Sequence, residues 1–269
     1  MSEFVLKSGS RVKQPFNKIW FVVGAILIML MIAGQFIPTD FRNVQLGELG
    51  VIIKKLFVPY GGRSWADYFG YFKEMGTPLL QTIQISLGGT VIGSLFAFPF
   101  AFLTARNVIK NKYISMPIKF IMNFIRSIPT IILAVLATFL VGNGVLSGIV
   151  AITLFSFGIM AKMLYEAIET VDMGPFEALE STGANKLVAF RHAIVTQITP
   201  IYLGYLIYIF EINIRASAIL GYVGAGGIGS VISDNILYNY NRVGVAIIVI
   251  FITVIIVQVL SSTARRYIK

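Results

Sequence analysis

Long apolar runs separated by short polar segments are the main pattern along this sequence. A helix that crosses a bilayer needs about 20 mostly apolar residues, because each residue rises about 1.5 Å and the hydrocarbon core is about 30 Å thick. Six runs meet this requirement, at 19 to 37, 79 to 105, 118 to 141, 145 to 165, 201 to 220 and 243 to 262. The pattern therefore predicts an all-α integral membrane protein with about six transmembrane helices.

Two of the connections between these runs are long. The first, 38 to 78, combines Pro and Gly with an aromatic piece from 65 to 72, which predicts turns and a short amphipathic helix. The second, 166 to 200, is where acidic residues concentrate. We therefore expect an N-terminal helix with an extracytoplasmic connector over 1 to 75, followed by the main transmembrane domain over 76 to 269.

Composition and charge agree with a membrane location. The chain is 57% hydrophobic and 13% charged, with a net charge of +10. Such a charge favours nucleic acid only when the basic residues form one stripe, and here they lie at the ends of apolar runs. Most of the 22 Lys and Arg residues fall on the side of the N-terminus, which predicts that both termini are cytoplasmic. The expected environment is the lipid bilayer, with no nucleic-acid partner.

Several kinds of chemistry are excluded by the residues present. The chain has no Cys and one His, His192, so it offers no multi-histidine metal site. It has no G-x-x-x-x-G-K-[ST] sequence to hold ATP phosphates. The run 224 to 229 matches G-x-G-x-x-G but lacks the flanking strand and helix of a dinucleotide site. We expect no catalytic residue, metal or cofactor on this chain.

The acidic connection has its own local pattern. Pro175 opens a stretch of good helix formers, Gly183 ends it, and a second amphipathic stretch follows. This order predicts helix, turn and helix. Two interpretations remain open at this point: a solvated connector, or a short helix that docks in a groove of a soluble partner.

The same connection carries a family resemblance. The pattern Glu177-Ala178, then Gly183 and later Pro200, resembles the EAA loop of binding-protein-dependent ABC importer permeases. Leu179 departs from the second alanine of that motif, and Thr196 stands where many members have proline. The resemblance implies that 166 to 200 is a coupling loop. In it, Glu177 and Ala178 would dock on the ATPase subunit and Gly183 would form the turn.

A second resemblance is to the phosphonate-uptake permease, through residues 126 to 130, 210 to 216 and 221 to 229. It implies the fold of an ABC type I importer permease, similar to methionine permeases, in the bacterial cytoplasmic membrane. The implied partners are a second copy of the chain, two ABC ATPase subunits that hold ATP and Mg, and an extracytoplasmic substrate-binding protein. The implied cargo is phosphonate, phosphite or phosphate. Alternatives are a permease for another small solute such as methionine, and an ion-coupled secondary transporter.

Polar residues inside the fifth run are candidates for the substrate pathway. Glu211 and Arg215 have the i, i+4 spacing of a helical ion pair, which predicts mutual neutralisation inside the bundle. The functional alternative is that Arg215, with Asn213 as a second donor, faces the pathway of an anion.

The glycines that follow, Gly224, Gly226, Gly227 and Gly229, predict a flexible turn at the outer face. A second hypothesis makes them an outer gate or binding-protein contact whose N–H groups meet the anion.

Overall fold

The structure is a computed structural model that describes residues 3–5, 11–13, 19–36, 46–108 and 111–268. Its contacts divide the chain into two units, Met1–Val51 and Ile52–Lys269. The first unit contains a hairpin of β1 (Glu3–Val5) and β2 (Arg11–Lys13), with Phe4 opposite Val12. Its strands have three residues each, and the other described elements of the chain are helices, as the all-α expectation requires.

Two helices follow the hairpin among the described residues. Helix α1 (Ile19–Phe36) is apolar along its length, and its described side chains are almost all exposed. Helix α2 (Leu46–Phe57) is amphipathic and ends in the second unit.

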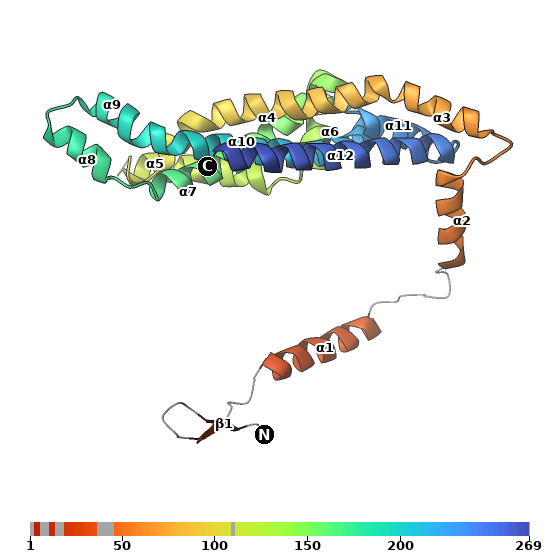
Figure 1. The fold of residues 1–269 in the computed structure, drawn as a ribbon, viewed down its shortest axis with the longest axis horizontal. Helices are drawn as coiled ribbons and strands as arrows, with labels where there is room; N and C mark the ends of the chain where they lie inside the picture. The colour runs from red at the N-terminus through yellow and green to blue at the C-terminus, as the bar shows by residue number, and fades with distance from the viewer. Residues whose placement is uncertain (1–2, 6–10, 14–18, 37–45, 109–110, 269) are drawn as a thin grey trace. The chain divides into compact units, whose positions relative to one another are not determined.

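The second unit is a bundle of helices that lie lengthwise beside one another (Figure 1). Its long helices are α4 (Gly76–Thr104), α7 (Val145–Glu169), α10 (Thr196–Leu220) and α12 (Tyr240–Ile268). Shorter helices are α3 (Trp65–Glu74), α5 (Lys112–Ser127), α6 (Thr130–Val141), α8 (Gly174–Ser181), α9 (Lys186–Ala189) and α11 (Ile228–Asn235). Helices α8 and α9 lie at one end of the bundle, and α3 and α11 lie toward the other (Figure 1).

Among the described residues, the straight spans are fewer than the six that the sequence predicted. Within the described residues, four helical segments are long and apolar enough to cross a membrane: Trp65–Thr104, Val145–Glu169, Phe190–Val223 and Tyr240–Ile268. The expected span 118 to 141 is instead two helices, α5 and α6, that meet at 94° and make a fifth span only if counted together. Pro129 causes this break, because proline lacks an N–H and disfavours helical geometry at the preceding residue. The apolar stretch of α1, Ile19–Gly34, is shorter than these segments.

Small residues set the most extensive helix contact among the described elements, which lies between α4 and α7. Gly89 and Gly93 are buried on α4, and a Cβ atom on either would overlap atoms of Ile152 or Thr153 on α7. This is the small-residue spacing that allows membrane helices to approach closely. The two helices therefore form the closely packed centre of the bundle.

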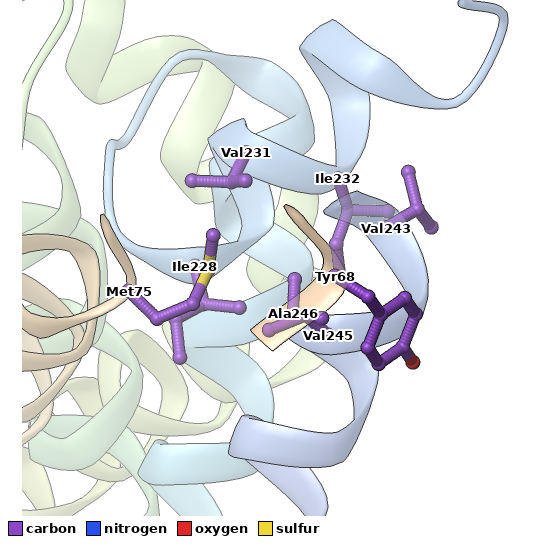
Figure 2. Close-up of a cluster of buried hydrophobic side chains, with 8 residues drawn as sticks. All are labelled: Tyr68, Met75, Ile228, Val231, Ile232, Val243, Val245 and Ala246. Atoms are coloured by element: carbon purple, nitrogen blue, oxygen red, sulfur yellow. The ribbon is translucent and has the colours of Figure 1, made fainter. Parts of the chain in front are cut away.

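The end of the bundle opposite α8 is held by a separate apolar cluster. Figure 2 shows its side chains, which come from α3, α11 and α12 and from the residue between α3 and α4: Tyr68, Met75, Ile228, Val231, Ile232, Val243, Val245 and Ala246. The Tyr68 hydroxyl donates to the Leu56 carbonyl at 3.2 Å, and the buried Asn241 amide donates to the Lys55 carbonyl at 3.0 Å. These bonds hold the end of α2 to the bundle, in agreement with a compact unit that begins at Ile52.

Candidate functional site

The connection between α7 and α10 has the helix, turn and helix that its sequence predicted. Helix α8 carries Pro175 in its first turn, and Gly183 follows its end with φ of 85°. The Gly183 N–H donates to the Glu180 carbonyl at 3.0 Å, and the Ala184 N–H donates to the Leu179 carbonyl at 3.2 Å. This pair of bonds is the Schellman ending of a helix, which requires the left-handed conformation that glycine adopts without strain.

One side of α8 is packed and the other is open. Phe176 and Leu179 pack on an apolar cluster that includes Ile194 and Ile198. Glu177 and Ala178 are exposed. The loop is tied down by a bond from the Gln197 amide to the Asp172 carbonyl at 3.1 Å. The exposed pair is therefore presented on a fixed support.

The acids of this loop differ in whether they have partners. Four of the five bond to groups of the same chain: Glu166 to Lys162, Glu169 to Lys119, Asp172 to the Gly174 N–H, and Glu180 to Lys186. The Glu177 N–H donates to the Met173 carbonyl at 3.0 Å, but within the part of the chain that the structure describes the Glu177 carboxylate has no hydrogen bond or ion pair. An exposed, unpaired carboxylate on a supported helix is available to a partner protein.

A second cluster of charges lies between α10 and α12. Glu211 and Arg215 form the predicted i, i+4 ion pair, and the Glu211 side chain is only 9% exposed. Arg265 of α12 adds two bonds of 3.1 Å to the other Glu211 oxygen, through both of its terminal nitrogens. Two guanidinium groups thus share one carboxylate, which leaves one surplus positive charge in the triad Glu211–Arg215–Arg265.

Asn213 is placed differently from the substrate-facing expectation. Its side chain is fully buried, and its amide donates to the Thr90 hydroxyl and to the Ser156 hydroxyl, both at 2.7 Å. These partners belong to α4 and α7. Because both amide hydrogens are used, Asn213 has none left for a substrate and instead ties three helices together.

The glycine turn between α10 and α11 is held by α4. Gly224, Gly226 and Gly227 all have positive φ, as expected for a tight turn. The Gly227 N–H donates to Gln81 Oε1 at 3.1 Å, and the Ile228 N–H donates to Thr82 Oγ1 at 2.9 Å.

Internal bonds and close packing account for much of this turn. The Gly224 N–H is also used, by the Gly221 carbonyl at 3.2 Å. Gly229 is buried where a Cβ would overlap the Ala218 carbonyl, so its role here is close packing of α11 on α10. The N–H groups of Gly224 and Gly227 already donate to groups of this chain, so they are not free to bind an anion. Contact with a binding protein stays a prediction.

Sequence reasoning missed the part that Arg265 plays in this cluster of charges. No local spacing links it to Glu211, because 54 positions separate them. It also missed the hydroxyl residues that serve Asn213. The signal for Thr90 was present, because it belongs to a row of small polar residues at helical spacing on α4, Ser86, Thr90 and Ser94.

Spanning helices, a supported loop helix with an open acid, and ionic groups inside the bundle together define a membrane transport subunit. The chain belongs to the family described as binding-protein-dependent transport system inner membrane component, whose model matches residues 97–268. It is accordingly a multi-pass protein of the inner membrane.

Two of the relatives that this chain matches are permease proteins of bacterial transport systems. The chain is 35% identical to a phosphite transport system permease protein of Stutzerimonas stutzeri over 95% of this chain and 90% of that protein. It is 34% identical to a phosphate-import permease protein of Mycolicibacterium smegmatis, over 71% of this chain and 36% of that protein.

A solved structure shows the same fold. The inward-facing MetNI methionine ABC transporter aligns with a TM-score of 0.65 and 23% identity, covering 72% of this chain and 96% of the solved chain. The ABC type I permease fold expected from the sequence is thereby confirmed.

Proposed function

We propose that this chain forms the membrane pathway of an ATP-driven importer for phosphite, phosphonate or phosphate. The observation that carries the proposal is the 35% identity to a phosphite permease over 95% of the chain. The surplus positive charge of the triad supports it, because a cation held in an apolar environment attracts an anion that can neutralise it. The likeness to a methionine transporter is one of fold and adds no argument about the cargo.

The assembly we propose has two copies of this chain, two ABC ATPase subunits and one extracytoplasmic binding protein. ATP and Mg²⁺ would be held by the ATPase subunits. Both termini and α8 would face the cytoplasm, with Glu177 and Ala178 of each copy seated in a cleft of one ATPase. The support for this seat is that Glu177 is exposed and unpaired while its neighbours in the loop are bonded.

The mechanism follows from the rigid support of α8. Closure of the ATPase subunits around ATP would draw the two α8 helices together and open the pathway outward, where the binding protein delivers the anion. Hydrolysis would reset the pathway inward. Arg215, whose side chain is 49% exposed, would offer charge-assisted hydrogen bonds to the passing anion. Glu211 would limit how tightly the anion is held.

The test is the ATPase activity of the assembly in lipid vesicles, with the binding protein and phosphite, phosphonate or phosphate added in turn. We expect at least one of these anions to stimulate hydrolysis, and Glu177→Lys to abolish that stimulation. Glu166→Lys is the matched control, because Glu166 pairs with Lys162 on its own helix. Stimulation by methionine alone, or uptake driven by an ion gradient without ATP, would refute the proposal.

A further inference from the structure

A cavity of about 650 Å³ lies between α7, α10 and α12, beside the triad. Its wall is largely apolar, with Met163, Ile201 and Ile268 as its aliphatic part. Tyr205, Tyr208 and Arg265 contribute the polar groups. The cavity is thus an apolar hollow with one cation at its edge.

The polar groups of this cavity have bonding capacity left over. Arg265 uses only two of its N–H groups on Glu211, and a guanidinium carries five. No hydrogen bond of the Tyr205 or Tyr208 hydroxyl occurs among the residues that the structure describes. The cavity wall therefore carries the surplus charge of the triad and also unused hydrogen-bond donors on Arg265, Tyr205 and Tyr208.

The cavity lies at the end of the bundle that carries α8. Met163 is within two turns of the end of α7, and Ile201 is within two turns of the start of α10. Arg265 is in the last turn of α12. Tyrosine and arginine at the end of a membrane helix are typical of the layer where lipid headgroups meet the hydrocarbon.

We propose that this cavity binds an anionic phospholipid, with its phosphate at Arg265 and an acyl chain along the aliphatic wall. Charge complementarity selects an anion, and the apolar wall selects a ligand with a hydrocarbon part. A small free oxyanion would match the cation but would leave most of the wall without a contact. The proposal goes beyond the transport function and does not depend on which solute is carried.

The first test is native mass spectrometry of the purified full-length protein titrated with phosphatidylglycerol or phosphatidylcholine. We expect phosphatidylglycerol to bind more tightly, and Arg265→Gln to weaken its binding about fivefold while leaving phosphatidylcholine unchanged. Arg266→Gln is the matched control, because it removes the same charge from an exposed neighbour outside the cavity wall. Equal losses in the two variants would overturn the proposal, since they would indicate general attraction to the membrane surface.

A second variant leaves every charge in place. Gly204 borders the cavity, and a Cβ added there would meet no atom within 4 Å. Gly204→Phe should therefore fill the hollow without disturbing the backbone, and we expect it to remove the tight phosphatidylglycerol site. Retention of that site in Gly204→Phe would contradict the proposal.

Two further outcomes would replace the proposed lipid with another occupant. If inorganic phosphate displaced phosphatidylglycerol at millimolar concentration in an Arg265-dependent manner, the cavity would be a site for the free anion. If Gly204→Phe instead split a dimer into single chains, a second copy would be the occupant. Either result would overturn the lipid assignment.

Discussion

Arg265 in the last turn of α12 donates two hydrogen bonds of 3.1 Å to Glu211 on α10, a residue 54 positions earlier. The Glu211 carboxylate is therefore not simply neutralised by Arg215, because it is shared between Arg215 and Arg265. Charges inside a membrane protein are costly unless they are paired. The triad therefore both fastens α12 to α10 and leaves a positive charge that a second anion can meet.

The first prediction concerns how much each residue of this triad contributes to the free energy of unfolding. Glu211→Gln leaves two guanidinium groups without a carboxylate, and we expect it to lower the free energy of unfolding by about 3 kcal/mol. Arg215→Gln should cost about 1 kcal/mol or less, because that side chain is half exposed and Glu211 keeps Arg265. Arg265→Gln should fall between them. Thermal or denaturant unfolding in detergent measures the order, and a larger loss for Arg215→Gln than for Glu211→Gln would contradict it.

Local signals in the sequence predicted local structure well. Pro175 and Gly183 mark the start and end of α8 because each has a backbone preference that acts on its own neighbours. The i, i+4 spacing of Glu211 and Arg215 likewise predicted their pairing. The structure bears out both.

Features that depend on residues far apart in the chain were not predicted. Arg265 reaches Glu211 only because α12 packs against α10, and nothing near residue 265 indicates this. Hydropathy averaged over 118 to 141 hid the effect of Pro129, because a window sums apolar residues and ignores one missing N–H. Asn213 was interpreted from its polarity alone, without the hydroxyl partners that two other helices bring to it.

A second prediction separates a structural from a transport role for Asn213. Asn213→Leu removes the bonds to Thr90 and Ser156, and we expect a loss of about 1 to 2 kcal/mol in unfolding free energy, the upper range for hydrogen bonds between membrane helices. Anion-stimulated ATPase activity per folded assembly should be unchanged. If Asn213→Leu instead had normal stability and reduced anion-stimulated ATPase activity, Asn213 would have a role in the substrate pathway.

A third prediction tests the close packing of α4 on α7. Gly93→Ala places a methyl group against the Thr153 carbonyl and the Ser156 side chain, so it should destabilise the protein by about 1 to 3 kcal/mol. Gly88→Ala is the matched control on the same helix, because its methyl group would meet Ile149 at ordinary contact distance. We expect Gly88→Ala to be neutral or slightly stabilising in thermal unfolding. Equal effects of the two substitutions would contradict the assignment of Gly93 to close packing of α4 on α7.

The last prediction concerns the turn after α8, where conformation and side-chain size can be separated. Gly183 has φ of 85°, and a Cβ added there would meet no atom within 4 Å, so any penalty for substitution comes from the backbone alone. Gly183→Asn should be tolerated, because asparagine adopts the left-handed conformation more readily than other residues with a side chain. Gly183→Val should cost about 1 to 2 kcal/mol locally, which is enough to loosen the end of α8.

Because α8 is the proposed seat on the ATPase, the loosened helix should transmit ATPase closure poorly. We therefore expect Gly183→Val to keep the assembly intact but to reduce anion-stimulated ATPase activity severalfold, with Gly183→Asn close to the unmodified protein. Limited proteolysis of the loop provides an independent readout, since a frayed α8 is cut faster. If both variants were equally impaired, the conformation of Gly183 would not be the cause, and the side chain itself would have to interfere with docking.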